Sequence, residues 1–289
     1  MVAQLVTWSI YSSSMHSIFQ VLFANYSELH LPGLPPGLLE TSIMQASKTV
    51  IVTGASSGLG FAIAKAYLER GDNVVGNART LARLQDAADK LGNPANFLLV
   101  EGDISQPQTA ERLFAQAIEA FGKVDVLVNN AGIFIAKPVA EYTPTDIEAI
   151  VDTNLKGFVY PAQAAARHMT QNGAGQIIAI TASIALQPNT KVPALLPVLI
   201  KGGLNQAVRA LALELASAQV QVNGVAPGII DTPLHGDDPQ VRNALKALAP
   251  TGQIGTPQDV VDAVLYLSDS RFVTGTVMAV DGGSATGVW

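Results

Sequence analysis

The chain has 289 residues, 48% of them hydrophobic and 14% charged, with a formal net charge of -6. This composition is typical of an apolar-rich globular protein, and the acidic balance disfavours nucleic-acid or anionic-membrane partners, because both would repel it. Because the chain has no cysteine and its four histidines lack metal-ligand spacing, we expect neither disulfides nor a metal site.

The amino-terminal residues 1–45 differ in character from the rest. Residues 5–24 are apolar but are interrupted by Ser, Thr, His and Gln, so they are too polar to span a bilayer. No Lys or Arg precedes Lys48, so a secretory signal or another targeting segment fits poorly. We expect a cytoplasmic protein with a poorly ordered extension, or one whose physiological start is Met44, and one domain over residues 46–289.

From residue 48 onward, short strand-like runs alternate with helical patterns. The runs are apolar throughout, which indicates strands covered on both faces. Such alternation predicts an α/β fold: a single doubly wound, Rossmann-type domain with a central, mostly parallel seven-stranded sheet flanked by helices. The expected strands lie within residues 49–54, 73–77, 96–103, 124–132, 175–183, 220–228 and 277–283.

Three glycines mark the turn after the first expected strand. Gly54, Gly58 and Gly60 separate that strand from a helical pattern. Glycines there permit a tight turn and a close approach of backbone N–H groups to a pyrophosphate, which the helix N-terminus also attracts. In this context they predict a dinucleotide-binding site, although three glycines in a turn can also be a purely structural feature.

The spacing of these glycines within "TGASSGLG" resembles the short-chain dehydrogenase/reductase family. The likeness continues in order along residues 48–289, through the motifs "NNAG", "TNLKG", "ITAS", "KGGLN", "VNGVAPGIIDTP" and "VTGTVMAVDGG". It implies that Asp103 contacts the adenine, that the "NNAG" backbone lines the cofactor groove and that Thr232 meets the nicotinamide amide. The expected cofactor contacts are Gly54, Ser56, Ser57, Gly58, Leu59, Gly60, Arg79, Asp103, Ile104, Asn130, Ala131, Gly132, Lys201, Pro227, Gly228, Ile230 and Thr232.

The end of the second expected strand bears on the choice between NAD and NADP. A carboxylate at this point would bind both ribose hydroxyls and select NAD. The chain has Asn77, Ala78 and then Arg79, and a guanidinium can pair with a 2′-phosphate. We expect NADP to be preferred over NAD, unless Arg79 is simply a solvated residue that opens the next helix.

The resemblance also implies a catalytic group in which a serine, a tyrosine and a lysine act together and an asparagine holds a water relay. Ser183, Lys201 and Asn154 match three of these positions, but the tyrosine position holds Pro197. In the family the lysine lies one helical turn after the tyrosine and lowers the pKa of its phenol. A helix that starts near Pro193 would tolerate proline in its first turn, yet it would lack the proton donor.

Three other residues could replace the phenol. Tyr142 lies in a loop before a helix, and Tyr160 and His168 follow Asn154 in a helical pattern. A candidate acid must first lie within hydrogen-bond reach of the substrate, which the sequence does not establish. Ser183, Lys201 or a bound water could also supply the proton.

These features leave three hypotheses. The first is an NADP-dependent oxidoreductase that acts on a small-molecule carbonyl or alcohol substrate with an altered proton relay. The second is a catalytically silent cofactor-binding regulator, or a subunit of a hetero-oligomer, and the third is a non-redox enzyme on the same scaffold. We expect a homodimer or homotetramer, which the family forms through the helices that carry Asn154 and Lys201 and through the last strand. Residues 235–250 are the expected lid over the substrate.

Overall fold

The computed structural model describes residues 47–233 and 239–287. The extension predicted for residues 1–45 lies outside these ranges, as does part of the expected lid. The described residues form a seven-stranded parallel sheet in the order β3-β2-β1-β4-β5-β6-β7, which confirms the predicted fold class. The strands are β1 (Thr49–Thr53), β2 (Asn73–Ala78), β3 (Phe97–Glu101), β4 (Val126–Asn129), β5 (Gly175–Ile180), β6 (Val220–Pro227) and β7 (Val277–Val280).

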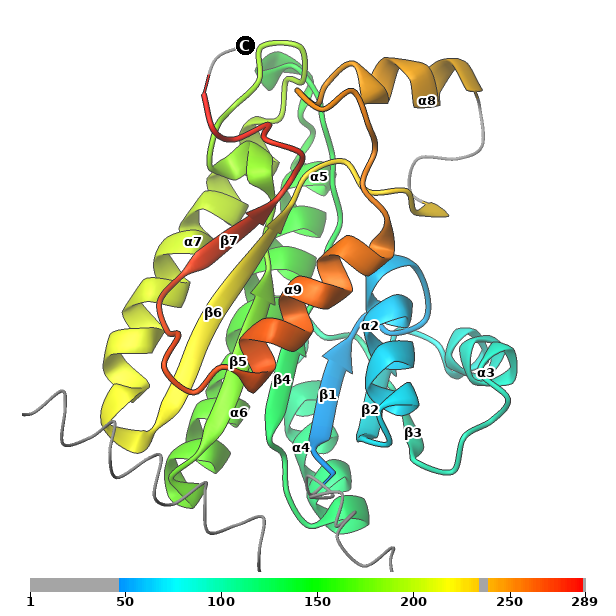
Figure 1. The fold of residues 1–289 in the computed structure, drawn as a ribbon, viewed down its shortest axis with the longest axis vertical. Helices are drawn as coiled ribbons and strands as arrows, with labels where there is room; N and C mark the ends of the chain where they lie inside the picture. Colours follow the sequence, from blue (N-terminus) through cyan, green and yellow to red (C-terminus); the bar gives the residue numbers. More distant parts are fainter. Residues whose placement is uncertain (1–46, 234–238, 288–289) are drawn as a thin grey trace, which may run out of the picture. The chain divides into compact units, whose positions relative to one another are not determined.

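Helices cover both faces of this sheet (Figure 1). Those that carry the argument are α2 (Gly58–Glu69), α3 (Leu81–Lys90), α4 (Pro107–Phe121), α5 (Pro144–Ile150), α6 (Gly157–Asn172), α7 (Leu195–Leu215), α8 (Pro239–Lys246) and α9 (Pro257–Asp269). A π-helical segment (Val151–Lys156) joins α5 to α6, and short 3-10 turns lie at Val139–Glu141, Ser183–Ala185 and Ala216–Ala218. No described helix is long and apolar enough to cross a membrane.

The uniformly apolar strands are explained by two cores. Successive strand side chains point to opposite faces. Ile51 therefore packs with residues of α4, α6 and α7, whereas its neighbours Val50 and Val52 pack with residues of α2 and α9. All three are fully buried. Burial of apolar surface on both faces contributes about 25 cal/mol per Å², which holds the sheet as a rigid platform.

The strand order reverses between β1 and β4. β1 pairs in parallel with β2 on one side and with β4 on the other, with Val50 opposite Val126. The connections from β1 and from β4 therefore run to opposite sides, which opens a crevice at the carboxyl ends of these strands. Gly54 and Asn130, the residues that follow the two strands, border this crevice.

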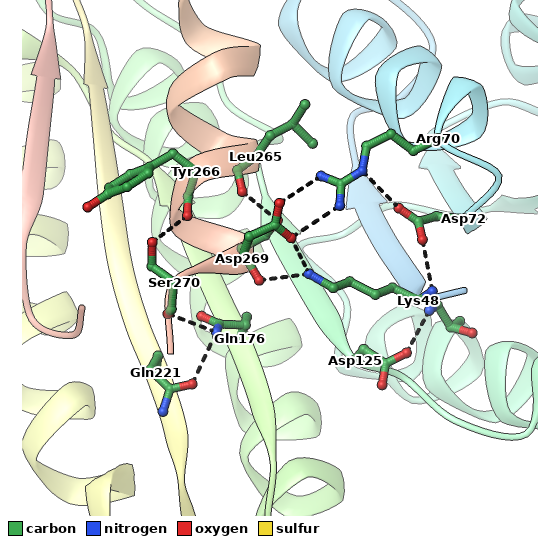
Figure 2. A network of polar contacts seen from close by, with 12 residues as sticks. Lys48, Arg70, Asp72, Asp125, Gln176, Gln221, Leu265, Tyr266, Asp269 and Ser270 are labelled. Atoms are coloured by element: carbon green, nitrogen blue, oxygen red, sulfur yellow. Dashed lines mark hydrogen bonds and ion pairs between the residues drawn. The ribbon is translucent and has the colours of Figure 1, made fainter. Parts of the chain in front are cut away.

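The opposite end of the sheet is closed by a polar network (Figure 2). The Lys48 backbone amide donates to Asp72 at 2.8 Å, and its ammonium donates to Asp269 at 2.5 Å. Arg70 donates to the same carboxylate from the end of α2. Although burial opposes the shift, hydrogen bonds from Arg70 and Lys48 lower the pKa of Asp269. The network therefore fastens the start of β1 to the ends of α2 and α9.

Candidate active site

A cavity of about 850 Å³ lies at the carboxyl ends of the strands, where segments that follow all seven of them meet. Nearly all the residues that the sequence predicted for cofactor binding or catalysis line it. These are Gly54, Ser56, Ser57, Gly58, Leu59, Arg79, Asp103, Ile104, Asn130, Ala131, Gly132, Ser183, Lys201, Pro227, Gly228, Ile230 and Thr232. Gly60 and Asn154 also belong to the predicted set, but they are not among the residues that line the cavity.

The glycine turn has the shape that a pyrophosphate cradle requires. Gly54 and Gly58 have φ angles of +70° and +56°, in the left-handed region that favours glycine. The amides of the first turn of α2 lack helical partners and can donate to an anion. A Cβ on Gly60 would collide with the Gly54 carbonyl oxygen and lie 2.5 Å from Asn130 Nδ2. Gly60 therefore lets α2 pack against the turn and does not itself face the cavity.

Thr53, which the sequence analysis did not single out, fixes the second side of the crevice. Its hydroxyl accepts hydrogen bonds from the backbone amides of Asn130 and Ala131, both at 2.9 Å. Its carbonyl oxygen accepts from Asn130 Nδ2 at 2.9 Å. The segment after β4 is thereby tied to the end of β1. Because these partners are more than 70 residues apart, no local pattern indicates the contact.

The far end of the cavity, beyond the glycine turn, is basic. Arg79, at the end of β2, and Arg83, in the first turn of α3, are exposed and line it together. Arg83 Nη2 lies 3.5 Å from the Ser57 hydroxyl oxygen. The amide of Asn77 donates at 3.1 Å to the carbonyl oxygens of Val100 and of Gly102, so it is occupied by backbone. Arg83 was missed by the sequence analysis, and its only local signal is its spacing of four residues from Arg79.

The other end is organised around Gly132. A Cβ on this glycine would lie 3.3 Å from both Lys201 Nζ and Asn154 Oδ1, a tight contact that would push these groups by a few tenths of an ångström. Lys201 reaches this point from α7 and donates to the Ile180 carbonyl oxygen at 2.7 Å. The side chain is buried, and this burial lowers the pKa of the Lys201 ammonium to about 8. The lysine is therefore a stronger acid than an ordinary one.

Asn154 holds the loop after β4. Its Oδ1 accepts from the Ile133 amide at 2.7 Å, and its Nδ2 donates to the Ile133 carbonyl oxygen at 2.8 Å. It lies in the π-helical segment between α5 and α6, a rare distortion that is frequent at functional sites. The Asn154 side chain was predicted to be catalytic, but it is engaged by backbone and positions the Gly132 segment from behind.

Ser183 stands at the opening of a 3-10 turn directly after β5. The residue is buried, borders the cavity and has no hydrogen-bond partner for its hydroxyl within the described residues. A hydroxyl left without a partner beside a cavity can donate to a bound ligand. Ser183 and Lys201 are thus brought to the same end of the cavity from β5 and α7.

Pro197 is the third residue of α7, which starts at Leu195, slightly later than the sequence predicted. The first turn of the helix closes with the Val198 amide, which donates to the Ala194 carbonyl oxygen at 2.9 Å. Proline at the preceding position removes no intrahelical bond, because the first amides of a helix have no partner there. Its ring is buried and does not border the cavity.

None of the three residues considered as substitutes for a phenol borders the cavity. The Tyr142 hydroxyl donates to the Ile135 carbonyl oxygen at 2.9 Å, and Tyr160 packs against one of the cores. His168 accepts a hydrogen bond from the Val124 amide at 3.1 Å, and burial lowers its pKa. These side chains have structural partners outside the cavity, so among the described residues Lys201 and Ser183 are the candidate proton donors that border it.

Comparisons with known proteins agree with this arrangement. The family model described as enoyl-(acyl carrier protein) reductase matches residues 54–285. Glucose 1-dehydrogenase from Gluconobacter oxydans is 36% identical over 245 residues, which are 82% of this chain and 92% of that protein. The structure of 3-ketoacyl-(acyl-carrier-protein) reductase from Brucella melitensis, complexed with NADH, has a TM-score of 0.77, 29% identity and coverage of 82% and 98% of the two chains. That of ElxO with NADP bound has a TM-score of 0.78, 26% identity and coverage of 83% and 100%.

Proposed function

The chain belongs to the short-chain dehydrogenase/reductase family, and on this premise we propose that it is an NADP-dependent oxidoreductase that interconverts a carbonyl group and a secondary alcohol. The matched family and relatives support NAD(P)-dependent oxidoreduction at a CH–OH group. The observation that carries the proposal is the meeting of Lys201, Ser183 and Gly132 at one end of a cavity whose other end has a glycine cradle and two arginines.

The residues present fit a nicotinamide dinucleotide. Backbone amides would hold the pyrophosphate. They come from the turn at Gly54 and Gly58, which have positive φ angles, and from the first turn of α2. Asp103 and Ile104 would border the adenine, and the Lys201 ammonium would hold the nicotinamide ribose. When bound, the cofactor supplies the hydride that reduces the carbonyl carbon.

The preference for NADP rests on charge. Arg79 and Arg83 are both exposed and border the cavity, so two guanidinium groups would bind a 2′-phosphate there through charge-assisted hydrogen bonds. Asn77, which stands where an acid would favour NAD, turns its amide to backbone carbonyls and offers no negative charge. Both features favour NADP.

The altered proton relay is the second part of the proposal. In reduction, the Lys201 ammonium gives a proton to the carbonyl oxygen, while the Ser183 hydroxyl donates a hydrogen bond to the same oxygen. The neutral amine then regains its proton from water. A pKa near 8 suits this task at neutral pH, because a general acid works best when its pKa lies near the operating pH. In oxidation the same amine accepts the proton.

The experiment is NADPH oxidation with a panel of aldehydes, ketones and quinones. The parent should turn over, and Lys201→Met and Ser183→Ala should each be about 10²-fold slower or more, as expected for loss of a general acid or a transition-state hydrogen bond. Because Lys201 would also hold the ribose, cofactor binding is measured in parallel, and rates are compared at saturating NADPH.

A silent cofactor-binding protein is the second candidate, and Pro197 is the observation that favours it. In that case NADPH binds, the parent shows no turnover with any carbonyl, and Lys201→Met weakens cofactor binding without removing any activity. That result would overturn the oxidoreductase and retain the binding site.

A further inference from the structure

The wall of the cavity beyond Ser183 is apolar. Its side chains come from separate parts of the chain: Phe134 follows β4, Ile184 lies in the 3-10 turn after β5, Val192 precedes α7, and Leu245 and Leu248 belong to α8 and the turn after it. Phe134 is 40% exposed. These segments border the same cavity as Ser183 and Lys201, and the proposed function puts the substrate between them.

Two carboxamides are the main polar features of this wall. Gln187 and Asn189 both border the cavity from the segment between β5 and α7. The Asn189 Oδ1 accepts from the Lys191 amide at 2.9 Å, which leaves its NH₂ group as a donor. The Gln187 carboxamide makes no hydrogen bond with any described residue, so it can both donate and accept.

Charge is absent from this wall as far as the described residues reach. The charged side chains that border the cavity are Arg79, Arg83 and Asp103 at the adenine end, and Lys201 beside Gly132. Lys201 is committed to the Ile180 carbonyl oxygen and, in the proposed function, to the ribose and the reacting oxygen. Among the described residues that border the cavity, no cation is therefore left to neutralise a carboxylate or phosphate on the substrate.

From these features we propose that the substrate is an uncharged, predominantly apolar ketone or aldehyde, with at most one or two polar groups that Gln187 and Asn189 bind. The inference deepens the proposed function and rests on it. A substrate carboxylate would be taken from water to an apolar wall without a partner, which disfavours it. A polyhydroxylated sugar would leave most of its hydroxyls unpaired against Phe134, Ile184 and the two leucines.

The test uses two matched pairs of carbonyl compounds. One pair is 4-methylacetophenone and 4-acetylbenzoate, which differ by a methyl group against a carboxylate, and the other is propanal and glyceraldehyde. With saturating NADPH, kcat/KM should favour 4-methylacetophenone over 4-acetylbenzoate by about 100-fold or more, and propanal over glyceraldehyde by about tenfold or more. Equal values within a pair, or preference for the charged or hydroxylated partner, would overturn the inference.

A charged substitution in the wall tests directly whether the wall determines the preference for uncharged substrates. Leu245→Arg puts a cation on the cavity side of α8 and should raise the ratio of 4-acetylbenzoate to 4-methylacetophenone turnover by about tenfold or more. Val241→Arg is the matched control, because Val241 is exposed on the same helix and does not border the cavity. It should leave the ratio unchanged. A switch in both variants, or in neither, contradicts the inferred wall.

A binding readout distinguishes failure of this inference from failure of the proposed function. The rise in melting temperature caused by each ketone is measured with the parent protein, with and without NADP⁺. If no compound is reduced but 4-methylacetophenone still stabilises the protein more than 4-acetylbenzoate does, the oxidoreductase proposal fails and the apolar site stands. If neither compound stabilises the protein and neither is reduced, both proposals fail.

Discussion

The ammonium of Lys201 donates a hydrogen bond to the carbonyl oxygen of Ile180 at 2.7 Å, which joins the second turn of α7 to the last residue of β5. The contact holds a buried amine beside Gly132, and no carboxylate among the described residues pairs with it. Its pKa is lowered by burial and no counter-ion restores it. The chemistry proposed for this chain depends on that environment.

The pH dependence of reduction should report this lysine. Because the ammonium is the acid, the rate at saturating NADPH should be constant below about pH 8 and fall about tenfold per pH unit above it. The rate of alcohol oxidation should show the opposite limb and rise up to about pH 8. In Lys201→Met, the pH dependence of both rates should disappear. If the parent's rates stay constant from about pH 6 to about pH 10, Lys201 is not the titrating group.

Stability should follow the same group with a defined sign. The folded pKa of Lys201 is about 8 and the ordinary value is 10.5, so between these values the unfolded chain binds more protons than the folded one. The free energy of unfolding attributable to Lys201 therefore rises with pH across this window, and the penalty for burying the charge is fully present below it. Lys201→Met should flatten this part of the stability curve measured by urea unfolding.

Replacement of Pro197 by tyrosine should restore a phenol one helical turn before Lys201. The position needs no backbone amide bond, so the helix accepts either residue. NADPH-dependent carbonyl reduction should rise about 10²-fold or more, the usual worth of a positioned general acid. Pro197→Phe is the control, because it adds the ring without the hydroxyl. Equal rates for the two variants would show that the gain, if any, is not proton transfer.

The two arginines should determine cofactor choice. Parent protein should bind NADPH more tightly than NADH, and Arg79→Ala or Arg83→Ala should each weaken NADPH binding by about tenfold while NADH binding stays the same. Arg209→Ala removes an exposed guanidinium on α7, outside the cavity, and should change neither. Calorimetric titration measures all four proteins. Indistinguishable affinities of the parent for NADPH and NADH would remove the argument from charge.

Two glycine-to-alanine variants should move stability in opposite directions. Gly60→Ala places a Cβ against the Gly54 carbonyl oxygen and Asn130, and overpacking of this kind costs about 1–3 kcal/mol. Gly203 lies inside α7 and nothing is within 4 Å of a Cβ built there. Gly203→Ala should stabilise the protein by about 0.5–1 kcal/mol. Urea unfolding of the two variants beside the parent provides the comparison.

Exposed leucines on α7 should mediate self-association. Leu199 and Leu213 are 62% and 83% exposed, whereas Leu204, Val208 and Leu215 of the same helix are buried. We expect a symmetric homodimer or homotetramer that covers them. Light scattering at micromolar concentration measures the mass, and a purely monomeric protein would contradict this expectation.

The fold was accessible from the sequence because its signals are local. Each strand is a short apolar run, and the turn glycines Gly54 and Gly58 follow directly from their place between strand and helix. The position of Arg79 directly after β2 likewise predicts that it borders the cofactor site. Parallel topology then brings the ends of the strands together, so most of the cavity lining could be predicted.

The residues that the sequence did not indicate, and the predicted ones that lie outside the cavity lining, depend on contacts between distant segments. Asn154 binds the backbone of Ile133, and Thr53 holds the amides after β4, pairings that no periodicity reveals. Arg83 carries no motif, and its relevance follows only from how α3 turns beside the glycine loop. Gly60 fits the family spacing and packs against the Gly54 carbonyl oxygen, and the spacing alone does not tell which glycine faces a ligand.

The polar network around Lys48 has a practical consequence for fusing this domain to another protein or immobilising it on a support. β1 begins at that network (Figure 2), whereas the residues that line the cavity follow the carboxyl ends of the strands. A tag, a partner enzyme or a solid support joined just before Ser47 would therefore meet the domain at the face away from the cavity. Immobilisation through that point should leave substrate access intact, provided that Lys48, Asp72 and Asp269 are retained.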